Sequence, residues 1–297
     1  MPGIVIQYIA MALSWGSNFF FVAIALQAFG YGQVTWARVV LAALALGAVV
    51  LIRRVPLPRR PVMYLHFLVT GVTSCTIPHL AFSWGQQYVG SGLAAIYNSA
   101  APLATAAIAV LLFRIERLTL LRVAGLLLGL GGVVVIIGPW SAGADGQLLG
   151  QVACLVAAAS YGFSLVYLRR FVLPHDIPAL AVAFLNVAAA AVFSLVLTTA
   201  LVFQPFQFEI LPFLALLVLG VVGTGFSHIW NLNVLRAWGP VAVSTVAYLL
   251  PVVAVALGVA LLHERLTWNE PVGAAIVLVS VLLARGRVKP AGPQPPP

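Results

Sequence analysis

The chain has 297 residues, of which 63% are apolar and only 7% are charged, and its formal net charge is +9. Soluble domains carry about 25% charged residues, so this chain has too few charges to cover a water-exposed surface. The composition therefore excludes a soluble globular protein. It indicates an integral membrane protein whose basic residues contact lipid headgroups rather than nucleic acid.

Ten apolar runs follow one another along the chain, and a helix needs ~20 such residues to cross the bilayer. The runs are twice as long as barrel strands and do not alternate, so we predict an all-α membrane fold with ten transmembrane helices. No cleavable signal peptide is expected, because the first run lacks a basic start. The runs cover residues 5–26, 33–52, 62–87, 91–112, 119–138, 148–168, 179–203, 211–235, 240–262 and 270–286.

The basic residues are distributed unequally between the two sides of the predicted bundle. With a cytoplasmic N-terminus, 13 of the 15 Lys and Arg residues fall in even-numbered connections or in the C-terminal segment. The exceptions are Arg38, inside the second run, and Arg265. Positive charges accumulate on the cytoplasmic side, so we predict cytoplasmic termini and a location in the cell inner (plasma) membrane.

The two halves of the chain repeat one another at an offset of 148 or 149 residues. Glu-Arg-Leu-Thr occurs at 116–119 and again at 264–267, and Gly90 matches Gly239 in the same register. Each half holds five runs, and because five is odd the second half must enter the membrane from the opposite side. We predict two inverted five-helix repeats around a central cavity. The predicted units are 1–139, 147–288 and a disordered Pro-rich tail, 289–297.

Paired motifs carry a family resemblance over nearly the whole chain. Ser14-Trp15-Gly16 begins the series, Pro102 and Pro251 follow Ala and Leu in the fourth and ninth runs, and a Glu-Arg-Leu-Thr motif follows each of those runs. In these features the sequence resembles the EamA family of the drug/metabolite transporter superfamily, and within it the YddG-type exporters of aromatic and other neutral amino acids. The resemblance implies a cavity built by the first, third, fourth, sixth, eighth and ninth helices, and export from the cytoplasm.

Six runs carry polar or aromatic side chains three or four residues apart, which places each set on one helix face. Polar groups within a span face the bundle interior or a cavity. We predict that these faces converge on a wet, aromatic-lined cargo site; the alternative is that single Ser, Thr and Asn side chains link helices by hydrogen bonds. The candidate substrate-binding residues are Met11, Ser14, Trp15, Asn18, Thr76, His79, Ser83, Tyr97, Asn98, Ser160, Tyr161, Ser164, Thr224, His228, Asn231, Ser244 and Tyr248.

Two residue pairs related by the repeat are the most informative. Trp15 lies near the middle of its run and Tyr161 is its mate, so both rings are predicted to stack on a flat cargo, with core packing as the alternative. His228 follows His79 by 149 residues. Because mates run in opposite directions, His79 is expected toward the outer side and His228 toward the inner side. They are interpreted as cargo or gate contacts, or as neutral imidazoles bonded to neighbouring helices.

Arg38 lies inside the second run near its outer end, so its side chain is expected to snorkel to the headgroups, with carboxylate binding or a structural counter-charge as the alternative. Pro102 and Pro251 interrupt backbone hydrogen bonding at matched positions and are predicted to be hinges, with plain packing as the alternative. Both Glu-Arg pairs of the repeated motif are expected to be helix-end residues that anchor the chain at the interface.

Several chemistries are disfavoured by residues that the sequence lacks. All six carboxylates lie in connections or at run ends, so a mid-membrane carboxylate proton relay has no candidate. The sequence contains no phosphate-binding Gly-x-x-x-x-Gly-Lys loop and no metal-ligand motif. We therefore expect no catalytic residues, no metal and no cofactor, and we predict that the protein is not an enzyme.

The predicted function is a secondary transporter that exports small neutral or zwitterionic metabolites, foremost aromatic and other neutral amino acids, by facilitated alternating access. A drug or nucleoside exporter with the same cavity is the alternative, and a membrane scaffold or enzyme is a more distant one. The expected partners are a small-molecule substrate and the lipid bilayer, without nucleic acid. A monomer is expected, with a dimer through Gly125-x-x-x-Gly129 as the alternative.

Overall fold

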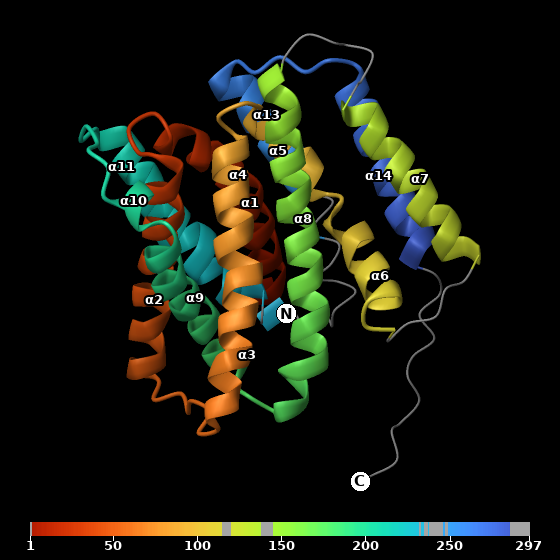
Figure 1. The fold of residues 1–297 in the computed structure, drawn as a ribbon. Helices are drawn as coiled ribbons and strands as arrows, with labels where there is room; N and C mark the ends of the chain where they lie inside the picture. Colours follow the sequence, from red (N-terminus) through yellow and green to blue (C-terminus); the bar gives the residue numbers. More distant parts are fainter. Residues whose placement is uncertain are drawn as a thin grey trace.

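The computed structural model describes residues 2–114, 120–137, 145–231, 233–234, 237, 246 and 249–285, and in these residues it is helical without strands (Figure 1). Helices satisfy their own backbone groups, which lipid cannot do. The elements are α1 (Pro2–Ala25), α2 (Tyr31–Ile52), α3 (Pro61–Gly71), η1 (Val72–Thr76), α4 (Ile77–Gly85), α5 (Ser91–Asn98), α6 (Ala101–Leu111), α7 (Leu120–Ile137), α8 (Asp145–Phe171), η2 (Leu173–His175), α9 (Ala179–Leu197), α10 (Thr199–Val202), α11 (Ile210–Leu217), η3 (Val218–Phe226), α13 (Leu249–Leu262) and α14 (Asn269–Arg285).

Seven helices in the described residues are long and apolar enough to cross a membrane. The fifth, ninth and tenth predicted runs form shorter apolar helices, at Val123–Ile136, Leu249–Leu262 and Asn269–Ser280. Large apolar side chains remain exposed on the outside of the bundle, as lipid contact requires; Leu44 is 66% exposed and Val196 is 73% exposed. The prediction of an all-α membrane fold is confirmed.

Three spans are irregular, two of them at positions that the repeat relates. The third span passes from α3 through the π-helical segment η1 into α4, and its mate, the eighth, passes from α11 into the π-helical segment η3. The fourth span is interrupted at Ser99 and Ala100, and Pro102, which lacks an amide hydrogen, lies in the first turn of α6. Pro251 lies in the first turn of α13. π-Segments are rare and occur mostly at functional sites, so these irregularities direct attention to the middle of the bundle.

Equivalent helices of the two halves pack against each other in opposite directions. Along α2, Gly32 meets Leu201 of α10, which continues the span of α9, and Gly47 meets Phe184 of α9. Residue numbers rise along α2 as they fall along its mate, so the two are antiparallel. In the α7–α14 pair, side by side in Figure 1, Gly132 meets Val277, and the same antiparallel order holds along both helices. The α5–α13 pair is antiparallel as well. An inverted duplication produces this arrangement, because mate helices must cross the membrane in opposite directions.

The contacts between other helices are mirrored in the same way. Helix α1 packs against α13 and η3, as its mate α8 packs against α6 and η1. A single pair of hydrogen bonds shows the same symmetry: Ser14 Oγ donates to the Val222 carbonyl (3.4 Å), and its mate Ser160 Oγ donates to the Thr73 carbonyl (2.7 Å). The first and sixth helices therefore dock in the same manner, each onto the π-segment of the opposite half.

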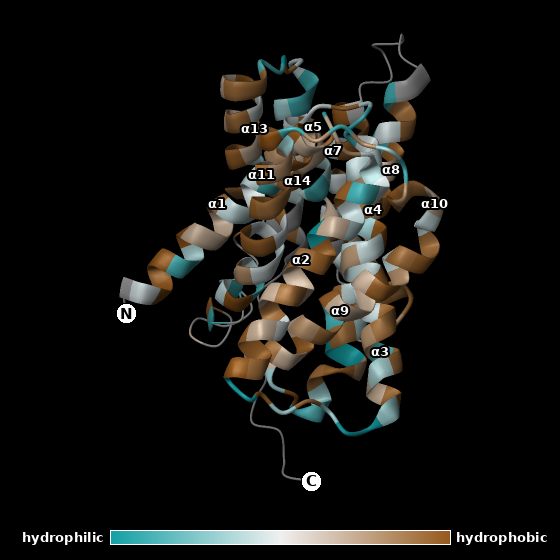
Figure 2. Ribbon diagram, turned by 90° about the vertical axis from the view of Figure 1, so that its left-hand side faces the viewer, coloured by the Kyte–Doolittle hydropathy of each residue, from teal (hydrophilic) through white to brown (hydrophobic). Residues whose placement is uncertain are grey.

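Polar and charged residues collect at the two ends of the bundle. Figure 2 shows hydrophilic colour mainly in the connecting segments and hydrophobic colour along the helices. The connection from Arg53 to Arg60 and the connection between α8 and α9, which follows Arg169 and Arg170, lie at the same end of the molecule (Figure 1). This placement agrees with the charge asymmetry of the sequence, which predicts that this end faces the cytoplasm.

Candidate functional site

One face of α1 is hydrogen-bonded to the π-segment η3 at mid-depth in the bundle. Trp15 Nε1 donates to Ser227 Oγ (2.8 Å), and Asn18 Nδ2 donates to the Gly223 carbonyl (3.0 Å). Helix α1 can approach this closely because Gly223 has no side chain; a Cβ there would collide with the Asn18 amide. A π-segment has a wider turn than an α-helix, so the hydrogen bonding of its carbonyls within the helix differs. Asn18 of α1 donates to one of these carbonyls, that of Gly223.

His228 joins this group from the turn that follows η3. Its Nδ1 donates to the Thr224 carbonyl, and its ring meets the Trp15 indole edge-on, with centroids 6.3 Å apart. The bond to the carbonyl fixes the orientation of the imidazole, so the ring is held against the aromatic face of α1. Trp15, Thr224 and His228, all predicted site residues, are thus brought together.

The mate face on α8 closes the opposite side of the group. Ser164 Oγ donates to the Thr70 carbonyl (3.5 Å), parallel to the bond of Ser160 to Thr73. The Tyr161 ring lies 6.3 Å from Phe82, which meets Phe19 of α1 edge-on at 5.2 Å. Phe82 and Phe19 extend the aromatic lining beyond the predicted set, and only their tertiary contacts identify them.

Nine buried side-chain atoms in the described residues have no hydrogen-bond partner. Buried polar atoms are normally bonded, and each exception costs about 1–3 kcal/mol. Six of the eight residues concerned belong to the predicted site, and Gln86 and Ser91 continue the series toward one end of the bundle. A group of polar atoms that the protein itself leaves unsatisfied is suited to water or to the polar groups of a cargo. The atoms are Asn18 Oδ1, His79 Nδ1, Ser83 Oγ, Gln86 Nε2 and Oε1, Ser91 Oγ, Tyr97 OH, Asn98 Oδ1 and Asn231 Oδ1.

Two predicted residues make packing or interhelical contacts. Met11 is fully buried in an apolar cluster with Val234 and Leu250, and Trp15 packs against the same cluster. Thr76 Oγ1 donates weakly to the Ala190 carbonyl (3.4 Å) and accepts a hydrogen bond from Ser194 (3.0 Å), both on α9. For these two residues the contacts match the alternative to a cargo site, in which side chains pack in the core or link helices by hydrogen bonds. The two remaining candidates, Ser244 and Tyr248, lie outside the described residues.

The expectation that Arg38 snorkels to the headgroups is wrong. The residue is only 5% exposed, and its Nε and Nη2 both donate to Thr224 Oγ1 (3.2 and 3.0 Å). Thr224 also accepts a hydrogen bond from His228 Nδ1 through its carbonyl, so the guanidinium belongs to the same group of residues. The sequence could not indicate this, because the partner lies on the π-segment of the other half.

The two imidazoles differ in their bonding. His79 is buried, and its Nδ1 has no hydrogen-bond partner among the described residues. His228 is partly buried, and its Nδ1 donates to the Thr224 carbonyl. Their placement toward opposite sides of the membrane stays a prediction.

Glu264 has a more specific position than the interface anchor that was expected. Its two carboxylate oxygens accept the Ser91 amide (2.6 Å) and the Gly92 amide (2.9 Å) at the start of α5. A Cβ on Gly258 or Gly90 would collide with this carboxylate, so both glycines make room for it. A negative charge at a helix N-terminus is stabilising, and here it joins α13 of one half to α5 of the other. Its mate Glu116 lies outside the described residues.

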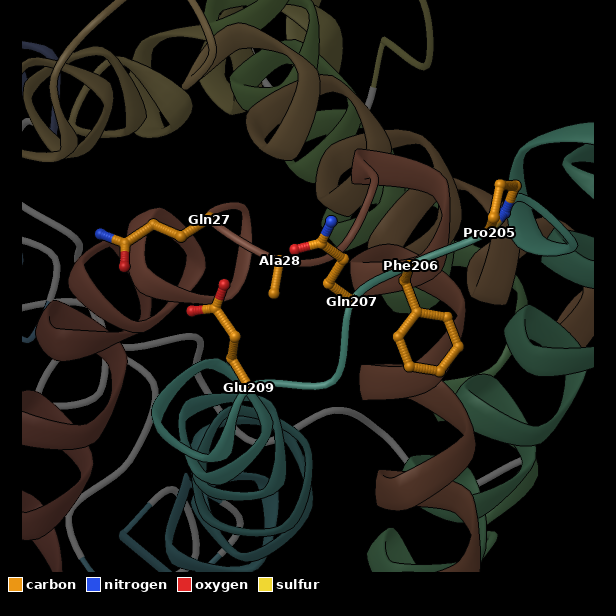
Figure 3. Close-up of a pocket in the computed structure, with 6 residues that line it drawn as sticks. All are labelled: Gln27, Ala28, Pro205, Phe206, Gln207 and Glu209. Atoms are coloured by element: carbon orange, nitrogen blue, oxygen red, sulfur yellow. The ribbon is translucent and has the colours of Figure 1, made fainter.

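Two open grooves accompany the buried site. One, of about 430 Å³, is lined by α1, η3 and α13 and reaches the predicted face at Ser14. The other, of about 400 Å³, lies between the turn after α1 and the connection before α11, where Gln27, Gln207 and Glu209 surround it (Figure 3). The unsatisfied polar atoms themselves are buried in this conformation.

Comparison with known proteins places the chain among membrane transporters. The sequence profile of the EamA-like transporter family matches residues 2–138 and 148–286. The chain is 29% identical over 286 residues to the uncharacterized inner membrane transporter YedA of Escherichia coli (strain K12), covering 92% of this chain and 88% of YedA. It is 27% identical over 213 residues to the uncharacterized transporter YoaV of Bacillus subtilis (strain 168), covering 68% of each. A crystal structure titled only "Crystal structure of protein" shares the fold, with a TM-score of 0.64, 21% identity and 96% coverage of both chains.

Proposed function

Because the chain belongs to the EamA-like transporter family, it is an integral membrane transporter, and we propose that it exports small neutral or zwitterionic metabolites, foremost aromatic and other neutral amino acids. Family and relatives point to transport rather than catalysis, and their names state no cargo. The substrate class is therefore argued from the site.

One observation carries the proposal. The buried, unpartnered Asn18 Oδ1 lies on α1 with the ring of Trp15, and Tyr97, whose OH also has no partner, shares a buried cluster with Phe82 and Tyr161. Aromatic rings offer stacking surface to a flat apolar side chain, and the unsatisfied polar atoms offer hydrogen bonds to an amino or carboxylate group. An aromatic amino acid requires both kinds of contact.

The symmetry of the fold supports movement by alternating access. The mirrored docking of α1 and α8, through Ser14 and Ser160, gives the site two equivalent walls that belong to opposite halves. The enclosed polar atoms fit an occluded state between inward-open and outward-open states. When the two halves exchange conformations, the site closes to one side of the membrane and opens to the other, as in other inverted-repeat transporters.

Flux through purified protein in liposomes tests the substrate class. We expect saturable movement of labelled Phe, Trp and Met. Trp15→Ala removes a stacking ring and an interhelical hydrogen bond, and it should lower flux about 10- to 100-fold, the effect of losing one large apolar contact. The matched control is Trp268→Ala, because Trp268 is 66% exposed and lies in a connection.

Three results would count against the proposal. Liposomes that carry no amino acid contradict the substrate class. Nucleosides or drugs that move while amino acids do not would favour the alternative cargo. Equal flux through Trp15→Ala and the control would remove Trp15 from the site.

A further inference from the structure

Arg38 is a buried cation whose only hydrogen-bond partner in the described chain is a hydroxyl group. Two of its nitrogens share Thr224 Oγ1, and Nη1 donates to no described residue. A charge within a membrane bundle is costly unless an opposite charge or several dipoles compensate for it. One threonine oxygen, which also donates to the Leu219 carbonyl (3.0 Å), supplies little of that compensation.

The carboxylates whose side chains the structure describes do not provide the counter-charge. Four have described side chains: Asp176 and Glu209 are exposed in connections, Glu264 caps α5, and Glu270 accepts the Thr267 amide (3.0 Å). None contacts Arg38. In the described part of the chain the guanidinium is therefore poised for an anion that the protein itself does not contribute.

The surroundings define what kind of anion could bind. Thr224, which holds the guanidinium, also accepts the imidazole of His228 through its carbonyl, and His228 touches Trp15. Two residues, Thr224 and His228, thus link the guanidinium to the proposed stacking ring of Trp15. A carboxylate on Arg38 would place a short apolar or aromatic side chain among these rings.

We propose that Arg38 binds the carboxylate of the cargo and that Thr224 positions the guanidinium for it. This inference rests on the proposed transport function and narrows its substrate class to solutes that carry a carboxylate. Arginine is suited to this task because its planar fork offers paired donors to both oxygens and stays charged when buried. The proposal also explains why a membrane helix retains an otherwise uncompensated cation.

Competition against labelled Phe flux in proteoliposomes tests the proposal. Unlabelled Phe and 3-phenylpropionate keep the carboxylate, whereas phenylalaninamide and 2-phenylethylamine lack it. For the wild type, we expect the compounds without a carboxylate to compete about 10- to 100-fold more weakly, as loss of a charge-assisted hydrogen bond implies. Arg38→Gln should lose Phe flux to a similar extent and no longer distinguish Phe from phenylalaninamide. Arg60→Gln, in an exposed connection, is the matched control.

Thr224 is tested as a positioning residue. Thr224→Val should raise the KM for Phe without raising the KM for any transported amide, and Thr224→Ser, which keeps the hydroxyl, should restore it. A merely structural hydroxyl would change the flux of both compounds alike. That result would overturn the positioning role.

The outcomes separate this inference from the proposed function. If the wild type carries no amino acid, the transport proposal fails. If it carries Phe but phenylalaninamide competes equally well, the carboxylate proposal is overturned while transport stands. Should Arg38→Gln not yield a monodisperse protein, the wild-type competition alone decides the question, because it needs no variant.

Discussion

At the scale of single residues, the site combines groups that the fold satisfies with groups that it leaves unsatisfied. Trp15 and Ser160 have partners in the opposite half, whereas Tyr97 is fully buried and its hydroxyl has none. Such an atom lowers stability, so its presence is better explained by a requirement of function than by packing. Stability and transport should therefore respond in opposite directions at this position.

Removal of the Tyr97 hydroxyl tests this view. We expect Tyr97→Phe to leave the unfolding free energy unchanged or to raise it by about 1 kcal/mol, because a desolvation cost disappears. Phe flux should fall. The measurements are thermal unfolding in detergent and proteoliposome flux on the same preparation.

A bonded hydroxyl provides the contrast. Thr70 is equally buried, and its Oγ1 bonds to Asn186, so Thr70→Val should cost about 1–3 kcal/mol. If Tyr97→Phe destabilises the protein as Thr70→Val does, the tyrosine hydroxyl is a structural bond and does not belong to the cargo site.

Residue types and spacing predicted which side chains lie together better than they predicted the contacts of those side chains. Trp15, Asn18 and His228 share a region because each lies on the polar face of an otherwise apolar helix, a signal that is present in the sequence. The pairing of Arg38 with Thr224 joins residues 186 positions apart, so local patterning carries no trace of it. Snorkelling was expected because the sequence shows that Arg38 lies near the end of its helix. The sequence does not show that Thr224 is its hydrogen-bond partner.

At the scale of elements, the departures from regular helix matter most. The matched π-segments η1 and η3 and the break before Pro102 all lie beside the site. The length of the apolar runs predicted where the spans lie. A π-turn depends on how glycines and neighbouring helices pack, and the periodicity of the sequence does not reveal this packing. Whether Pro102 and Pro251 act as hinges remains a prediction; the structure shows that both begin or nearly begin a helix.

The Glu264 cap makes a prediction about α5. Glu264→Ala should expose the Ser91 and Gly92 amides, weaken the contact between the halves and cost about 1 kcal/mol, the usual value of a lost cap. Hydrogen–deuterium exchange over residues 88–96 should accelerate. Glu270→Ala is the control, because its carboxylate caps only its own turn at Thr267. Equal protection in the Glu264 variant and the wild type would mean that the cap does not hold α5.

At the scale of the whole molecule, the odd number of spans in each half determines the architecture. The repeated motifs and the charge asymmetry predicted inversion, and the antiparallel packing of α2 with α9 and of α7 with α14 has this geometry.

Exchange kinetics test the central claim, that two inverted halves alternate around one enclosed site. Proteoliposomes are preloaded with unlabelled Phe, and the uptake of labelled Phe is compared with that of empty liposomes. The account predicts saturable uptake that preloading accelerates, because a carrier returns faster when it is loaded. Uptake that rises linearly with concentration and does not respond to preloading would indicate a channel and contradict the account.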